Sequence, residues 1–177
     1  MNIINSRIMP CLKGTGICLL ISAVTLATSG CTSGFKGACA HGSDPAVITD
    51  FIKKGANPNS PMGGTGWTPL QHAAANNQNP AIIKALIDEG ADPNGFYAGQ
   101  GLVLMTPLQM AAWHNKNPDI AQALIDGGAE VNLLPPALKP NELGYTGPYR
   151  NMTPLAIALL KGKTAMADVI RKSGGHE

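Results

Sequence analysis

Apolar and small residues recur in four blocks along the chain, and each block predicts two short helices with one buried side. In the two clearest blocks, Thr-Pro-Leu-Gln is followed by an Ala-Ala pair, then by Leu-Ile-Asp, and finally by Gly-Ala and Asn. The first block keeps only the later part of this pattern, and the last block keeps Thr-Pro-Leu. Each block has too few apolar residues to form a core alone, so we expect the blocks to stack. The predicted repeats are 33–59, 67–94, 105–132 and 152–175.

Residues that satisfy free backbone groups mark the expected ends of these helices. Thr precedes Pro at three helix starts, where the hydroxyl caps the helix and proline lacks only an N–H that has no helical partner. Asp-Pro or Asn-Pro repeats this arrangement at three second helices. Gly55, Gly90 and Gly128 suit the left-handed conformation that ends a helix, and Cys39 aligns with alanines as a small buried residue. The expected caps are Thr68, Thr106, Thr153, Asp44, Asn79 and Asn117.

Thr-Pro-Leu, Ala-Ala, Leu-Ile and Gly-Ala-x-x-Asn at these offsets resemble the ankyrin repeat, and the resemblance covers residues 33–175. It implies an all-α solenoid of about four helix-turn-helix repeats, joined by extended hairpin loops that we call fingers. The connections at 95–104 and 133–151 are longer than the family's minimum, which is typical of recognition elements or spacers. The family's usual histidine is replaced at three positions, by Gln71, Gln109 and Ala156.

The first 30 residues resemble the signal peptide of a bacterial lipoprotein. Arg7 and Lys13 precede an apolar stretch at 17–27, and small residues then lead to Cys31, where a lipobox places its lipidated cysteine. The resemblance implies cleavage before Cys31 and a lipid anchor on it. Because Thr rather than Asp follows, it also implies an outer-membrane lipoprotein that faces the periplasm. An uncleaved apolar anchor, and an ordinary cleaved signal in which Cys31 is incidental, stay open as alternatives.

Removal of the predicted signal peptide, 1–30, would leave a repeat domain, 31–177, without net charge. Of 13 Lys and Arg, two lie before Cys31, so 11 remain against 11 Asp and Glu. Nucleic-acid binding needs concentrated positive charge, so this balance argues against it. With Cys31 lipidated, Cys39 would be the single free thiol of the mature chain and no intrachain disulfide would form. Without the lipid, a Cys31–Cys39 bridge stays open.

The resemblance implies a partner-binding surface made of the fingers and of variable positions in the first helix of each repeat. Six of the eight aromatic residues map to this surface, whereas Phe35 and Phe51 map to the core. Trp, Tyr and Arg are the side chains that most often anchor protein interfaces. Alternatively, the finger aromatics fold back over Trp113, Ile157 and Leu160. The candidate contact residues are Trp67, Phe96, Tyr97, Met105, Trp113, His114, Tyr145, Tyr149, Arg150, Met152, Leu160 and Lys161.

The sequence contains no arrangement typical of catalysis or metal binding. None of the histidines has a Cys or carboxylate at metal-ligand spacing, and the hydroxyls of Thr-Pro-Leu are expected to be caps. We therefore expect a protein that is not an enzyme, with no cofactor, metal or small-molecule substrate, whose partner is another protein.

Small ankyrin lipoproteins similar to this chain include immunity proteins against phospholipase effectors of type VI secretion. The resemblance implies that the chain binds and inhibits a lipase-type toxin in the periplasm. A periplasmic scaffold, or a protective partner of an envelope enzyme, is the alternative and would bind more weakly or more broadly. An enzyme with accessory repeats is disfavoured, because the predicted repeats occupy the whole mature chain.

Overall fold

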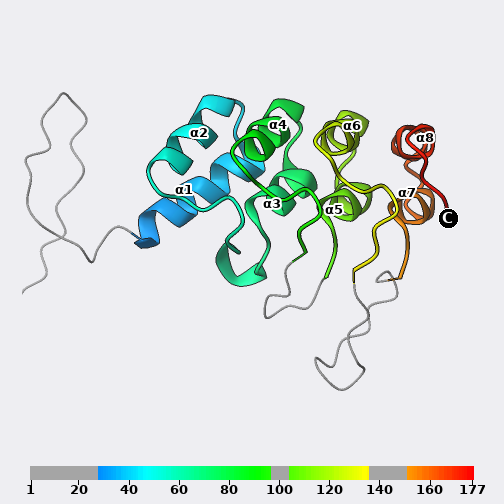
Figure 1. Ribbon diagram of the computed structural model, residues 1–177, viewed down its shortest axis with the longest axis horizontal. Coiled ribbons are helices and arrows are strands. Elements are labelled where there is room, and N and C mark those ends of the chain that lie inside the picture. The colour runs from blue at the N-terminus through cyan, green and yellow to red at the C-terminus, as the bar shows by residue number, and fades with distance from the viewer. Residues whose placement is uncertain (1–27, 97–103, 136–150) are drawn as a thin grey trace, which may run out of the picture.

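The computed structural model describes residues 28–96, 104–135 and 151–177. These residues form no sheet, and their one extended pairing is an isolated antiparallel bridge between Met62 and Trp67. The structure is therefore all-α, as the repeat pattern predicts (Figure 1). The helices are α1 (Thr28–His41), α2 (Pro45–Lys53), the 3₁₀ helix η1 (Gly63–Thr65), α3 (Pro69–Asn76), α4 (Pro80–Asp88), α5 (Pro107–His114), α6 (Pro118–Asp126), α7 (Pro154–Leu160) and α8 (Thr164–Lys172).

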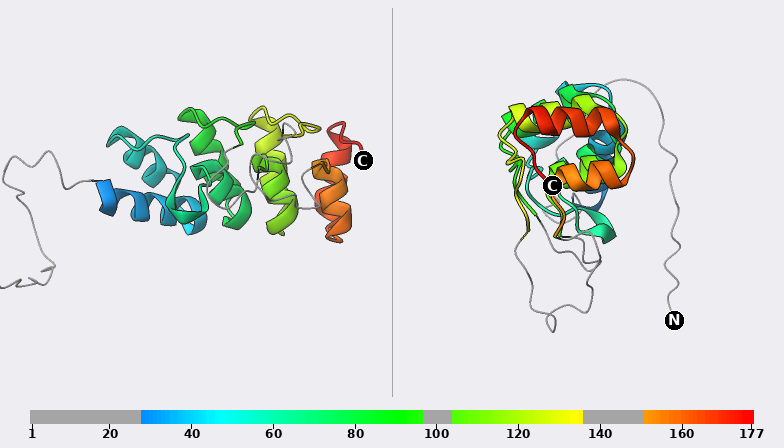
Figure 2. Two further views of the ribbon diagram at one scale, coloured as in Figure 1. Left: turned by 90° about the horizontal axis from the view of Figure 1, so that it is seen from below. Right: turned by 90° about the vertical axis from the view of Figure 1, so that its right-hand side faces the viewer.

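The helices form two rows, and each repeat contributes one helix to each row. In Figure 1 the lower row holds α1, α3, α5 and α7, and the upper row holds α2, α4, α6 and α8. Each helix packs against its neighbours in the same row and against the other helix of its repeat. Viewed along the stack, the rows make two layers (Figure 2). We call the lower row the helix-one row and the upper row the helix-two row.

The predicted caps are confirmed at all six helix starts. Thr68 and Thr106 each accept a hydrogen bond from the backbone N–H three residues later, and Gln71 and Gln109 accept one from the threonine N–H in return. These capping boxes satisfy N–H groups that a helix start leaves without partners. The remaining caps also accept from helix N–H groups through their side chains: Asp44, Asn79, Asn117 and Thr153.

The glutamines that follow Thr-Pro-Leu have a second role, which the sequence pattern did not predict. Nε2 of Gln71 donates to the backbone oxygen of Met105 at 2.6 Å, and Nε2 of Gln109 donates to that of Met152 at 2.9 Å. One amide serves both purposes because its oxygen accepts while its NH₂ group donates. Each glutamine thus ties the start of its own helix to the next repeat.

Buried asparagines in the turns between the two helices also join successive repeats. Nδ2 of Asn77 donates to the backbone oxygens of Cys39 and Gly42, at 2.9 and 3.0 Å. Nδ2 of Asn115 donates to those of Ala74 and Asn77, at 2.9 and 2.7 Å. The two asparagines are 3% and 1% exposed. Because water has little access, these bonds have no easy replacement.

A second set of asparagines joins the repeats where the chain leaves each second helix. Nδ2 of Asn59, Asn94 and Asn132 donates to the carbonyl of the glycine that ends the next second helix. Their Oδ1 atoms accept from the backbone N–H two residues beyond that glycine. The left-handed glycines predicted from the sequence are confirmed, with φ of 97° at Gly55, 91° at Gly90 and 94° at Gly128.

Aliphatic side chains and alanines make the core. The alanine pairs at 73–74 and 111–112 are fully buried, which lets adjacent first helices approach closely. Cys39 at the aligned position is also 0% exposed, so its prediction as a small buried residue is confirmed. Phe35 is buried, and the half-buried Phe51 packs on it with ring centroids 5.5 Å apart. Both therefore belong to the core of the first repeat, as predicted.

The first helix begins earlier than the repeat pattern predicts. α1 starts at Thr28 rather than at Ser33, so Cys31 lies within the helix. The segment ahead of Ser33 contains no proline that would prevent the helix from extending backwards. Most of the predicted signal peptide lies outside the described residues. Among the helices that are described, none has the length and apolar character needed to span a bilayer.

Candidate partner-binding surface

Aromatic side chains from successive repeats meet on the helix-one row. The ring centroids of Trp67 and His114 lie 5.7 Å apart, and those of His114 and Trp113 lie 6.4 Å apart in an edge-on arrangement. Nζ of Lys161 lies over the Trp113 ring, 3.3 Å from its centroid. These distances are typical of aromatic pairs and of cation–π contacts. We call the four residues the aromatic row, which spans the second, third and fourth repeats.

A buried histidine supports one end of the aromatic row. The ring centroid of His72 lies 5.2 Å from that of Trp67, and His72 is only 3% exposed. Its Nε2 lies 3.4 Å from the Thr65 hydroxyl and 3.5 Å from the Met62 carbonyl oxygen. Burial, and to a lesser extent the charge of Lys36, lower the pKa of His72, against the opposing effect of the Met62 carbonyl. The ring is therefore neutral at pH 7, and it packs against the indole at a tilt of 50°.

The connection between the first and second repeats, residues 60–66, which we call the first finger, fixes the backbone of Trp67. The Met62 N–H donates to the Trp67 oxygen at 2.8 Å, and η1 fills the turn between them. Gly66 closes η1 with a φ of 68°, a left-handed conformation that glycine adopts without strain. The indole is half-buried, so part of it remains accessible.

Lys163 supports the other end of the aromatic row by capping α5. Its Nζ donates to the backbone oxygens of Ala112 and Trp113, at 2.8 and 2.7 Å. The last carbonyls of a helix lack helical partners, and a cation stabilises that end. Burial, followed by the charges of Lys161 and Lys116, lowers the pKa of Lys163 to about 8. The neutral amine keeps two N–H donors, so both bonds survive deprotonation.

His114 lies at the centre of the row, next to positive charges. Its pKa is lowered by burial first, and then by the charges of Lys163 and Lys161. The imidazole is therefore neutral at pH 7, although the residue is exposed. A negative group placed beside it would favour the protonated ring instead.

Other predicted contact residues lie around this surface. Leu160 at the end of α7 is 58% exposed, and Phe96 at the start of the second finger is 37% exposed. Met152, next to the cap of α7, is half-buried. Ile157 is fully buried in the core. Leu160 and Phe96 thus leave apolar area open to a partner.

Met105 does not lie where the pattern predicts. It is 5% exposed and belongs to the core, so the expectation of a partner contact at its side chain is corrected. Trp67 occupies the same position of the preceding repeat and is only half-buried. The difference follows from shape, because a slim, flexible methionine fits an irregular gap in the core that an indole does not fit.

Four predicted contact residues lie outside the described residues: Tyr97, Tyr145, Tyr149 and Arg150. Their role in binding stays a prediction, as does lipidation of Cys31.

The described residues show little that could support chemistry. They include no group of three or more His, Cys, Asp or Glu placed to hold a metal ion. Cys39 is fully buried, and burial raises its pKa to about 12, so its thiol remains protonated. The hydroxyls of Thr68 and Thr106 act as helix caps. The arrangement is suited to contact with another surface.

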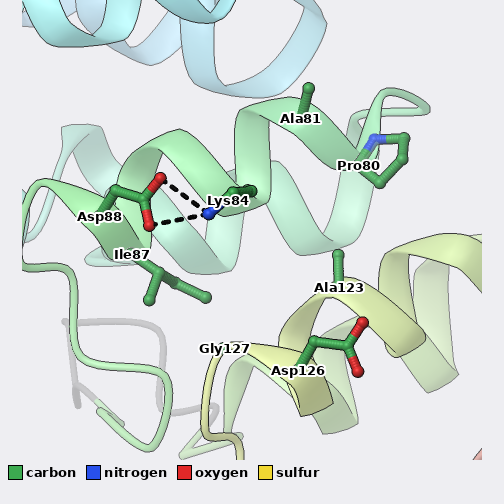
Figure 3. Close-up of a pocket in the computed structure, with 8 residues that line it drawn as sticks. All are labelled: Pro80, Ala81, Lys84, Ile87, Asp88, Ala123, Asp126 and Gly127. Atoms are coloured by element: carbon green, nitrogen blue, oxygen red, sulfur yellow. Dashed lines mark hydrogen bonds and ion pairs between the residues drawn. The ribbon is translucent and has the colours of Figure 1, made fainter.

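A separate groove lies on the helix-two row, between α4 and α6 (Figure 3). Its volume is about 480 Å³, and Lys84 forms an ion pair with Asp88 along one side at 3.0 Å. A Cβ added at Gly127 would lie 2.4 Å from Cδ1 of Ile87, so the end of this isoleucine would have to shift for a larger residue there. The charges of the Lys84–Asp88 pair offset each other and no aromatic ring lines the groove, which makes it a weaker candidate for a partner than the aromatic row.

Sequence reasoning missed both supports of the aromatic row. Nothing in the local pattern indicated that His72 lies beneath Trp67, since the contact depends on how the first finger folds. The sequence contains one weak indication of the role of Lys163. The last repeat lacks the asparagine found at 77 and 115, and a lysine bonds the preceding helix end in its place.

Comparison with known proteins agrees with the repeat architecture. A family model described as ankyrin repeats, in three copies, matches residues 35–134, which is more than half of the chain. No curated protein matches the chain.

Proposed function

The chain belongs to the ankyrin-repeat family, and we propose that it is a protein-binding module of the bacterial cell envelope. Ankyrin repeats are typically non-enzymatic modules for interaction between proteins. The observation that carries the proposal is the aromatic row, in which both tryptophans of the chain lie on one face of the solenoid. A monomer gains little from displaying indoles, whereas interfaces are enriched in them.

The exposed apolar side chains set the scale of the binding energy. Full burial of one large apolar side chain contributes ~1.5–3 kcal/mol. Trp67 and Trp113 are already half-buried, so with Leu160 they would contribute less than the ~9 kcal/mol of three fully exposed side chains, and at most about the ~8 kcal/mol of a micromolar complex. Ordering costs reduce this sum. Nanomolar binding would consequently need the fingers as well.

A lipid on Cys31 would hold the domain at the outer membrane, facing the periplasm. The proposal is supported by the basic and apolar residues that precede small residues and this cysteine. Cys31 lies in α1, four residues before the buried Phe35. A lipid there would hold the first repeat about one helical turn, ~5 Å, from its attachment point. Each buried CH₂ contributes ~0.8 kcal/mol, so two or three acyl chains would make the attachment lasting.

The finer proposal is that the partner is a lipase-type toxin and that the chain is its immunity protein. It is supported by resemblance to small ankyrin lipoproteins that inhibit phospholipase effectors of type VI secretion. An anchored domain with a rigid aromatic surface is also suited to meeting a toxin in the periplasm and covering its active site. Fold alone does not establish such a role, so the partner must be identified.

The test is a pull-down from envelope extract with a soluble form that begins at Thr32, followed by mass spectrometry. We expect one dominant lipase or other toxin, whose activity falls when an equimolar amount of the chain is added. Recovery of a housekeeping envelope enzyme that remains active would reject the immunity role and favour the scaffold.

Matched variants test the surface with the same partner. Trp113→Ala should weaken binding by more than ~1 kcal/mol. Val47→Ala, which changes an exposed apolar residue on α2 in the helix-two row, should not. Equal affinities of the two variants, with helix content unchanged, would place the contact elsewhere. Labelling with radioactive palmitate, and its loss in Cys31→Ser, tests the anchor.

A further inference from the structure

Charge is divided unequally between the two rows of helices. The helix-one row contains no Asp or Glu in any of its four helices, and its basic side chains are Lys36, His41, His72 and His114. The helices of the helix-two row carry acids: Asp50, Asp88, Asp119, Asp126 and Asp168. The turns that follow α5 and α7 add Lys116, Lys161 and Lys163, of which Lys161 lies over Trp113 and Lys163 bonds the Trp113 carbonyl. The first turn is different, since it carries Asp44.

Ion pairing follows the same division. The three ion pairs among the described residues all lie within the helix-two row, between residues three or four apart, so its charges are largely offset locally. Among the described residues, the charges that act on His72, His114 and Lys163 are all positive. His114 is influenced by Lys161 and Lys163, and Lys163 is influenced by Lys161 and Lys116. This clustering leaves an electrostatic cost that a negative partner would relieve.

We infer that the aromatic row docks an acidic segment of the partner protein, in which Asp or Glu side chains alternate with apolar ones. The inference rests on the proposed function, namely that this surface binds a protein. Lys161 holds its ammonium over Trp113, where a carboxylate can approach it from outside. Leu160 beside it is 58% exposed and offers contact to the next apolar side chain. Lys116, whose charge acts on Lys163, adds to the positive surface.

The same features argue against a nucleic acid as the occupant. A phosphate backbone requires closely spaced positive charges along its path. Here Leu159 and Leu160, which are 36% and 58% exposed, directly precede Lys161 and add apolar area to the surface. Apolar side chains of this kind match a peptide better than a sugar–phosphate chain. The two tryptophans alone would not distinguish these ligands, since both bases and side chains stack on indoles.

The test uses the full chain in an uncharged detergent, with tryptophan emission as the signal. The chain has two tryptophans, and both belong to the aromatic row, so a change in emission reports this surface directly. The first three probes are nine-residue peptides with Leu at every third position. The other positions combine serine with Glu in the first peptide, with Gln in the second and with Lys in the third. A single-stranded oligothymidylate of the same charge as the Glu peptide is the fourth probe.

We expect the Glu peptide to change the emission and to bind more tightly than the other three probes, with affinity that falls as salt is raised. Lys161→Gln should weaken its binding about three- to fivefold, the effect of one exposed charge. Lys172→Gln makes the same charge change on α8 and should stay within about twofold. Circular dichroism checks that both variants fold.

Several results would overturn the inference. These are equal binding of the Gln or Lys peptide, tighter binding of the oligothymidylate, no response to millimolar Glu peptide, or equal effects of the two variants. The proposed function fails separately. A captured partner that is insensitive to salt and to Lys161→Gln keeps the binding function and rejects the acidic segment. Acidic peptide binding without any captured protein supports the docking chemistry and rejects the function.

Discussion

Replacement of Asn115 by alanine tests whether buried amides, in addition to helix stacking, hold the repeats together. Nδ2 of Asn115 bonds the carbonyls of Ala74 and Asn77 in the preceding repeat. Its Oδ1 accepts from the backbone N–H of Asn117 and from Nε2 of Gln78, both at 3.0 Å. One side chain therefore joins the end of α3 to the start of α6.

The loss in the free energy of unfolding depends on which hydrogen-bond partners of Asn115 could find another partner. Gln78 is exposed and can turn its amide to water, but the other three partners are backbone groups around a side chain that is 1% exposed. A buried polar group without a partner costs ~1–3 kcal/mol, and the smaller alanine admits some water. We therefore expect Asn115→Ala to lower the free energy of unfolding by ~2–4 kcal/mol. That is a large part of the ~5–15 kcal/mol of an ordinary domain.

Asn94 provides the matched control. It joins two repeats in the same manner, donating to the Gly128 carbonyl at 3.1 Å and accepting from the Glu130 N–H at 2.7 Å, but its bonds are open to water. Asn94→Ala should therefore cost only ~0.5–1 kcal/mol. Urea titrations followed by far-UV circular dichroism measure both values. Equal losses in the two variants, or a loss below ~1 kcal/mol for Asn115→Ala, would refute the reasoning.

Three further predictions concern packing, charge and reactivity. Gly127→Ala should cost no more than ~1 kcal/mol in urea titrations, because its Cβ would meet Cδ1 at the movable end of Ile87. The cost should be smaller when the same change is made in Ile87→Val, which lacks that atom; an equal cost in both backgrounds would contradict the stated clash. Between the lowered pKa of Lys163, about 8, and the ordinary lysine pKa of 10.5, the unfolded chain binds more protons than the folded one. The free energy of unfolding should therefore rise with pH across this window. The rise should be absent in Lys163→Met, and an equal rise in that variant would show that other groups cause it. Cys39 is the one thiol in the form that begins at Thr32, and a thiol reagent should label it only after unfolding; rapid labelling of the folded chain would contradict its burial.

The sequence was sufficient for features that depend on neighbours along the chain. Thr68 and Asn79 were predicted as caps because a short polar side chain followed by Pro satisfies a helix start whatever the rest of the fold does. Gly90 was predicted to be left-handed on similar grounds, and its φ is 91°. Cys39 was predicted to be buried because alanine recurs at its position and the repeats are equivalent.

Features that depend on contact between repeats were not predicted. The position before Thr-Pro-Leu is the same in two repeats, yet Trp67 is half-buried and Met105 is in the core. Side-chain shape and the first finger decide this difference, and neither has a local pattern. The bond from Gln71 to the next repeat was also missed, because a capping box already accounts for a glutamine at that position. A glutamine that already has one evident role gives no sign in the sequence of a second.

Under the proposed function, stability and recognition depend largely on different residues of this solenoid. Alanine pairs and buried amides such as Asn115 hold the repeats together, while the two tryptophans pack half-buried against the core on the aromatic row. Trp113→Ala should therefore affect binding far more than folding, and Asn115→Ala the reverse. In the fourth repeat, a residue that joins two repeats lies next to one that is proposed to contact the partner. Lys163 bonds the Trp113 carbonyl, and Lys161, two residues earlier, lies over the Trp113 ring. A partner that orders this turn should consequently also stabilise the last repeat, so its binding should protect the amides of α7 and α8 from hydrogen exchange.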